Sequence, residues 1–198
     1  MSKVGIFVAN GCEEIEALTV VDLLRRAQID IEMISITDDK LISGAHGIDF
    51  WADVTKNEAN FSMYDGIILP GGLPGTDYLR EDAKVKSVIQ EFNAKGKLVA
   101  AICAAPTVLE NAGILENKKV TSYPSCEDKF KKSVYLNESV VTDENIITSR
   151  GMGTAIDFSL EIIKFLKDEQ TAQKLVVLTF IKKIRMSQNA KEGVPVIW

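Results

Sequence analysis

Two kinds of hydrophobic pattern alternate along the chain. Short strand-like runs rich in apolar residues occupy residues 4–9, 29–36, 64–69 and 98–102. Runs that are apolar on both faces are typical of parallel strands covered by helices on each side. Longer segments at about 13–28, 83–93 and 155–166 carry apolar residues every three or four positions, which predicts amphipathic helices. The alternation predicts an α/β fold with a mostly parallel central sheet.

The last third of the chain adds a hairpin and two helices. Residues 140–142 and 146–148 flank a short polar turn and predict two antiparallel strands. Residues 171–185 form a helical pattern with more than one apolar stripe, so this helix is expected to contact two surfaces, one of them in another subunit. No repeat or linker divides the sequence. We expect one domain over residues 1–198, with a core at about 3–185 and a tail at 187–198.

Composition narrows the classes of function. The chain has 198 residues, 46% of them hydrophobic and 26% charged, and its net charge is −5. Without a basic run to follow a phosphate backbone, nucleic acid is not an expected partner. No apolar run has the length of a membrane span. The N-terminus lacks a signal pattern, which favours reduced thiols in the cytoplasm. The three cysteines lack metal-ligand spacing, so no metal site is expected.

Residues 97–107 predict a nucleophile elbow. An apolar strand runs directly into Cys103 and then into a helix start at Pro106, with the small residues Ala104 and Ala105 between them. Such a turn exposes a side chain at the carboxyl end of a strand, and the amides of the helix N-terminus favour a thiolate with a lowered pKa. The alternative is that Cys103 is an ordinary buried cysteine at a strand end.

Other turns and acids are candidates for the same site. The glycines at 71 and 72 follow a strand and offer backbone amides to an oxyanion, and a second strand-to-helix turn lies at residues 148–154. Glu13 and Glu16 both stand at the head of an apolar helical stripe, where burial would raise the pKa of a carboxyl group. Each of them could instead be a solvated first-turn acid. His46, the only histidine, lies in a glycine-flanked loop and is read as a surface or interface residue rather than a base.

Four ordered motifs resemble the ThiJ/PfpI superfamily, in the branch of the parkinsonism-associated deglycases. They are residues 13–16 (EEIE), 69–72 (LPGG), 100–106 (AAICAAP) and 148–154 (TSRGMGT). The resemblance implies a flavodoxin-like three-layer α/β/α sandwich, a homodimer, no cofactor, and Cys103 as the reactive cysteine. It also implies that Glu16 is the protonated acid beside the sulfur and that Gly72 and Ala104 supply backbone donors. The implied pocket is lined by Gly71, Tyr123, Arg150, Gly151, Met152, Arg26 and His46.

The chain departs from this family pattern at two positions. Tyr123 stands before Pro124 where the branch has histidine, and Ala104 stands where peptidase-like members have histidine after the nucleophile. A phenol, with its ordinary pKa of about 10, is a poor base near neutral pH. A Cys-His peptidase is therefore disfavoured. The resemblance implies a glyoxalase or deglycase that acts on methylglyoxal-like dicarbonyls or their early adducts. One alternative is an oxidative-stress sensor or protective chaperone-like protein that acts through oxidation of Cys103. Another is a non-catalytic dimeric scaffold.

Overall fold

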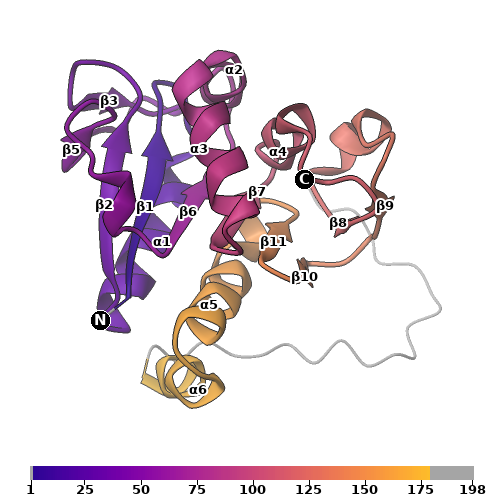
Figure 1. Cartoon of the computed structure of the whole chain (residues 1–198). Helices are drawn as coiled ribbons and strands as arrows, with labels where there is room; N and C mark the ends of the chain where they lie inside the picture. The colour runs from indigo at the N-terminus through magenta and orange to yellow at the C-terminus, as the bar shows by residue number, and fades with distance from the viewer. Residues whose placement is uncertain (1, 179–198) are drawn as a thin grey trace, which may run out of the picture.

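A seven-stranded sheet forms the centre of the molecule (Figure 1). The computed structural model describes residues 2–178. The strand order is β10-β11-β7-β6-β1-β2-β5, and every pair is parallel except β10 with β11. The predicted α/β fold with a mostly parallel sheet is thus confirmed. The strands are β1 Lys3–Val8, β2 Asp30–Ser35, β5 Val54–Thr55, β6 Gly66–Leu69, β7 Leu98–Ile102, β10 Val140–Asp143 and β11 Ile146–Ser149.

Helices cover both faces of this sheet and create two separate cores. One face packs against α1 (Glu14–Arg26), α5 (Ala155–Leu166) and α6 (Glu169–Leu178). The other packs against α2 (Gly75–Glu81), α3 (Ala83–Ala94) and α4 (Pro106–Ala112). Successive residues at the end of β1 show the division, because Ile6 and Val8 belong to the first core whereas Phe7 and the following Ala9 belong to the second. Side chains buried on both faces explain the continuous apolar runs.

Small elements surround the main sheet. A two-stranded sheet joins β3 (Leu41–Ser43) to β4 (Asp49–Trp51), and another joins β8 (Lys119–Val120) to β9 (Val134–Tyr135). Short 3-10 helices are η1 (Phe61–Met63), η2 (Pro124–Lys129) and η3 (Met152–Thr154). The predicted hairpin is present as β10 and β11.

Strand β8 is short. It ends at Val120, because the Thr121 N–H donates to Thr148 Oγ1 and the Tyr123 N–H donates to the carbonyl of Cys103 instead of to a neighbouring strand. One expected helix differs from the structure. The helix expected at 171–185 begins earlier, at Glu169. Its residues beyond 178, and the tail at 187–198, lie outside the described residues. No helix in the described range is long and apolar enough to cross a membrane.

The topology brings several loops to one edge of the sheet. From the central strand β1, the chain crosses to β2 on one side and later continues to β6 and β7 on the other. The carboxyl ends of β1 and β6 therefore flank the point where the direction of winding reverses, which is where open α/β sheets form their ligand crevices. The segment entering α1, the glycine loop after β6 and the turn after β7 all start at this edge.

Candidate active site around Cys103

Cys103 occupies a strained turn between β7 and α4. Its φ angle is +64°, in the left-handed region that residues with a side chain seldom adopt. Two long-range backbone hydrogen bonds hold this conformation: the Cys103 N–H donates to the Ser149 carbonyl (2.9 Å) and the Tyr123 N–H donates to the Cys103 carbonyl (2.8 Å). The predicted elbow geometry is therefore present, and the surrounding structure maintains the strain.

Thr107, which the sequence analysis did not single out, fixes the other side of the elbow. Its hydroxyl donates to the Ala104 carbonyl (2.7 Å), and the Arg80 guanidinium donates to the same hydroxyl (2.9 Å). A threonine in the first turn of a helix commonly bonds a nearby backbone carbonyl, so this contact was accessible from the sequence. The partnership with Arg80 joins α2 to α4 and depends on tertiary packing.

Glu16 is the carboxyl group that meets the cysteine. Its side chain is on the first turn of α1 and only 1% of the residue surface is exposed. The Gly71 N–H donates to Glu16 Oε2 (2.8 Å), and the same carboxyl group is hydrogen-bonded to the Cys103 thiol. A Cβ atom on Gly71 would lie 2.7 Å from both Glu16 Oε2 and Cys103 Cβ. Only glycine therefore permits this approach of backbone, carboxyl group and sulfur.

Burial shifts the ionisation of both members of the pair. Desolvation raises the pKa of Glu16 to about 7, even though hydrogen bonds from Gly71 and Cys103 act in the opposite direction. Desolvation, and then the charge of Glu16, raise the pKa of Cys103 to about 12; the Ala104 N–H lowers it without compensating. The lowered thiol pKa predicted from the helix N-terminus is therefore wrong in direction. Between about pH 7 and about pH 12 the pair therefore holds one proton, because a second ionisation would place two negative charges together.

The backbone donors stand in different positions. The Ala104 N–H is hydrogen-bonded to Cys103. Gly72 has a φ angle of +89° and lies against the backbone of Cys12 and Glu13, where a Cβ atom would come within 2.3 Å of the Glu13 nitrogen. Among residues 2–178 the Gly72 N–H has no hydrogen-bond partner. Both amides flank the elbow region, and neither N–H takes part in a hydrogen bond of a described helix or strand.

Gly151 and Tyr123 form the opposite wall. A Cβ atom on Gly151 would lie 3.9 Å from Cys103 Sγ, 3.9 Å from Glu16 Oε1 and 3.6 Å from the Tyr123 ring. Tyr123 and Met152 are both about half-exposed, so this wall borders solvent. Arg150 adjoins it, and its guanidinium donates to Asn137 Oδ1. Of the residues predicted from these two turns, Gly151 thus lies beside the sulfur and Tyr123 lies beside Gly151.

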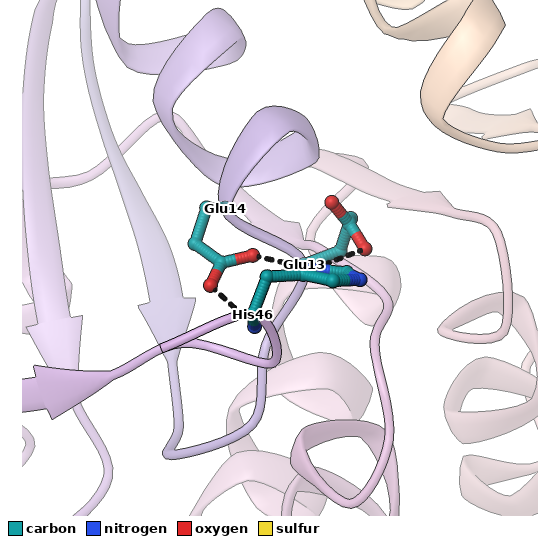
Figure 2. Close-up of side chains that lie close together, drawn as sticks. All are labelled: Glu13, Glu14 and His46. Carbon is teal, nitrogen blue, oxygen red and sulfur yellow. Dashed lines mark hydrogen bonds and ion pairs between the residues drawn. The ribbon is translucent and has the colours of Figure 1, made fainter. Parts of the chain in front are cut away.

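Arg26 and His46 lie elsewhere. Arg26 is at the C-terminal end of α1, ten residues after Glu16, which is about 15 Å along a helix. Its guanidinium forms an exposed ion pair with Asp22 (2.6 Å). His46 contacts Glu14 and Glu13 at the helix N-terminus rather than the cysteine (Figure 2). Within the described chain, the side-chain hydrogen bonds and ion pairs of these two residues are with Asp22, Glu13 and Glu14, not with Cys103 or Glu16.

Comparison with known proteins places this geometry in a family. The DJ-1/PfpI family model matches residues 2–165. This chain belongs to the DJ-1/PfpI family. The crystal structure of Drosophila melanogaster DJ-1beta has a TM-score of 0.89 at 32% sequence identity, covering 92% of this chain and all of that one. The residues matched by the family model include Glu16, Gly71 and Cys103.

Two curated relatives in this family differ in length. The Schizosaccharomyces pombe protein named "Glutathione-independent glyoxalase DJ-1" is 34% identical over 184 residues, covering 88% of this chain and 93% of that protein. The Arabidopsis thaliana protein named "Protein DJ-1 homolog B" is 37% identical over 172 residues, covering 86% of this chain. The present chain spans only 39% of the length of that second relative.

Proposed function

We propose that this member of the DJ-1/PfpI family is a cofactor-free, glutathione-independent enzyme that converts methylglyoxal-like dicarbonyls, or their early adducts, through Cys103. The observation that carries the proposal is the hydrogen-bonded pair of the partly exposed Cys103 and the buried Glu16, which is held by the Gly71 N–H. The name of the S. pombe relative supports the same reaction class. A carboxyl group with a pKa of about 7 suits proton transfer, because both of its forms are available near neutral pH.

The first step is attack of Cys103 Sγ on the aldehyde carbon of methylglyoxal. An S–C bond forms, and the electron pair of the C=O π bond moves to oxygen. That oxygen takes the proton shared by Cys103 and Glu16, giving a hemithioacetal and an ionised Glu16. The N–H groups of Ala104 and Gly72 are assigned to the developing oxyanion.

The second step moves hydrogen between the two carbons. The Glu16 carboxylate removes the proton from the hemithioacetal carbon, and the electron pair forms an enediolate with the adjacent ketone carbon. Glu16 then returns the proton to that second carbon, while the hydroxyl proton of the first carbon passes to the oxygen of the second. A lactoyl thioester results, and water hydrolyses it to lactate and the free thiol. Overall, methylglyoxal and water become lactate and a proton, so no oxidant or reductant is needed.

The test is lactate formation from methylglyoxal by purified protein in the absence of glutathione. We expect wild-type protein to form lactate and Cys103→Ser to lose all detectable activity. Cys126→Ser is the matched control, because Cys126 is a buried thiol on η2 outside the Glu16 pair. Lactate formation at the wild-type rate by Cys103→Ser would contradict the proposal, as would an inactive wild-type protein.

A second candidate function is sensing of oxidants, or protection that depends on oxidation of Cys103. It is favoured by one observation: Cys103 is partly exposed, whereas Cys12 and Cys126 are buried. Peroxide would supply the oxygen atoms, converting the thiol first to a sulfenic acid and then to a sulfinic acid. Intact-mass measurement after mild peroxide treatment should show two added oxygens confined to Cys103. Oxidation that begins at Cys12 or Cys126 would exclude this function.

We also propose that the chain forms a homodimer in the cytoplasm. Exposed apolar side chains of Ile15, Ile48, Ile156 and Leu178 border a shallow groove of about 690 Å³ beside α1. All three cysteines are free, as expected of a reducing compartment. Ile48→Glu should convert a dimer to a monomer in light scattering, whereas the equivalent change at exposed Val134, on the separate sheet of β8 and β9, should not. A monomeric wild-type protein would disprove this assembly.

A further inference from the structure

A second cluster of ionisable side chains lies at the start of α1, and its member Glu13 is near enough to the cysteine pair for its charge to raise the pKa of Glu16. Figure 2 shows the carboxyl groups of Glu13 and Glu14 directed at the imidazole of His46. His46 Nδ1 lies 3.0 Å from Glu14 Oε2 and 3.5 Å from Glu13 Oε2. One oxygen of each carboxyl group and one ring nitrogen all lie within 4.8 Å of one another. The proposed dicarbonyl chemistry uses none of these three side chains.

His46 Nδ1 is the ion-pair partner of both carboxylates but forms a hydrogen bond with only one of them. Nδ1 carries at most one hydrogen, and the shorter contact directs it to Glu14. Glu13 is only 15% exposed at its side chain, yet its carboxylate accepts no hydrogen bond from any described residue. The two carboxylates therefore share one imidazole as their cationic partner, and the cluster keeps a net negative charge that a divalent cation would balance.

The position of Glu14 is fixed independently of the histidine ring. Its Oε1 accepts the backbone N–H of His46 (2.7 Å), and its side chain is only 3% exposed. A Cβ atom at Gly44 would lie 2.2 Å from the same oxygen, so the loop approaches this carboxyl group as closely as glycine allows. With Oε1 held by the backbone, Oε2 remains directed toward Nδ1 and Glu13. This leaves one oxygen of Glu14 pre-positioned as a ligand.

We propose that Glu13, Glu14 and His46 form a site for Zn²⁺. Two carboxylate oxygens and one imidazole nitrogen at bond lengths of about 2.0–2.2 Å would lie roughly 3.3–3.6 Å apart in a tetrahedral site. The two contacts of Nδ1, at 3.0 and 3.5 Å, are near this spacing, and all three atoms lie within 4.8 Å of one another. When the metal binds, the proton on Nδ1 is released to solvent and the lone pair of Nδ1 bonds the metal. A water molecule fills the fourth position. Imidazole in the donor set favours zinc over magnesium or calcium. His46 is 66% exposed at its side chain and gives the ion an entry path.

The test is calorimetric titration of the full chain with zinc chloride. We expect one equivalent of Zn²⁺ per chain in wild-type protein, and at least tenfold weaker binding in Glu13→Gln and in His46→Gln. Glu13→Gln is the informative variant, because it leaves the contact between Glu14 and His46 intact and removes only a ligand. Glu127→Gln, which removes an exposed acid from η2 far from the cluster, should bind zinc like wild type.

Thiol ligation is the competing explanation and has its own control. Cys103→Ser should retain the same stoichiometry and affinity, and Co²⁺ bound in place of zinc should show no thiolate charge-transfer band. Three results would each overturn the proposal: no zinc binding by wild-type protein, which would make the cluster an ion pair only; unchanged affinity in Glu13→Gln and His46→Gln; or loss of the bound equivalent in Cys103→Ser.

Discussion

Glu14 and Glu16 lie two residues apart in the first turn of the same helix and are both buried, yet their pKa values shift in opposite directions. Burial would raise the pKa of Glu14, but hydrogen bonds from the ring and backbone of His46 outweigh it and bring the value down to about 2. Burial raises the pKa of Glu16 to about 7, because the Gly71 N–H and the Cys103 thiol do not compensate for the lost water. The helix dipole acts on both residues alike and so does not explain the difference.

The contrast assigns separate roles to the two carboxyl groups. An ionised Glu14 fixes the loop that carries His46, whereas Glu16 holds a proton beside the sulfur. The number and charge of the hydrogen-bond donors determine whether each carboxyl group is ionised or protonated. The face of α1 on which each glutamate lies determines which donors its carboxyl group contacts. Substitutions that remove only the charge can therefore test the two sites separately.

The largest expected effect is on catalysis. Glu16→Gln keeps an oxygen to accept the Gly71 N–H but cannot transfer a proton, so lactate formation should fall about 10²- to 10⁴-fold. Glu14→Gln should leave the rate per folded molecule within about threefold, since Glu14 lies outside the cysteine pair. Both rates are to be measured on protein whose circular dichroism matches wild type. Equal losses in the two variants would remove the distinction between these carboxyl groups.

The next largest effect is expected from separating Glu16 and Cys103 sterically. In Gly71→Ala the added methyl group would lie 2.7 Å from both partners, so one must move. We expect at least a tenfold loss of activity and about 1–3 kcal/mol of destabilisation in urea unfolding. Gly153→Ala is the matched control, because a Cβ atom there meets nothing within 4 Å. A fully active Gly71→Ala would show that the close approach is unnecessary.

A third prediction concerns the pH dependence of stability. The pKa of Glu16 is raised on folding, so its contribution is favourable below about 4.5 and is lost as pH rises toward about 7; the loss is on the order of 3 kcal/mol. The pKa of Glu14 is lowered, so its contribution is present above about 4.5 and is lost as pH falls toward about 2. When the free energy of unfolding is plotted against pH, Glu16→Gln should flatten the curve between about 4.5 and 7. Glu14→Gln should flatten it between about 4.5 and 2. The same slope change in both variants would refute the opposite shifts.

The sequence predicts the fold and the cysteine pair for different reasons. Apolar runs such as residues 98–102 specify buried parallel strands because burial on both faces leaves no polar alternation. The choice of Glu16 over Glu13 comes from the family resemblance, and the structure places Glu16, not Glu13, against Gly71 and Cys103. The burial of Glu14 has no counterpart in the local pattern, since it depends on a loop that arrives 30 residues later.

The ionisation of Cys103 illustrates a second limit of sequence-based reasoning. A helix start after a cysteine correctly identifies the amide that lowers the thiol pKa, but it does not reveal how much water the fold removes. Burial and the neighbouring Glu16 outweigh the Ala104 N–H and raise the value. Desolvation is a property of everything packed around a group, so it becomes visible only with tertiary structure.

The smallest expected effect is at Arg26, which tests how far the cysteine site extends along α1. Its guanidinium forms a solvent-exposed pair with Asp22, and such pairs contribute little to stability because water screens them. Arg26→Ala should therefore change lactate formation by less than about twofold and leave the unfolding midpoint nearly unchanged. Because Arg26 is remote from Cys103 within one chain, a tenfold loss of activity would mean that it reaches a pocket across a subunit contact. Repeating the measurement in Ile48→Glu separates these cases, since a contribution made across subunits disappears in a monomer.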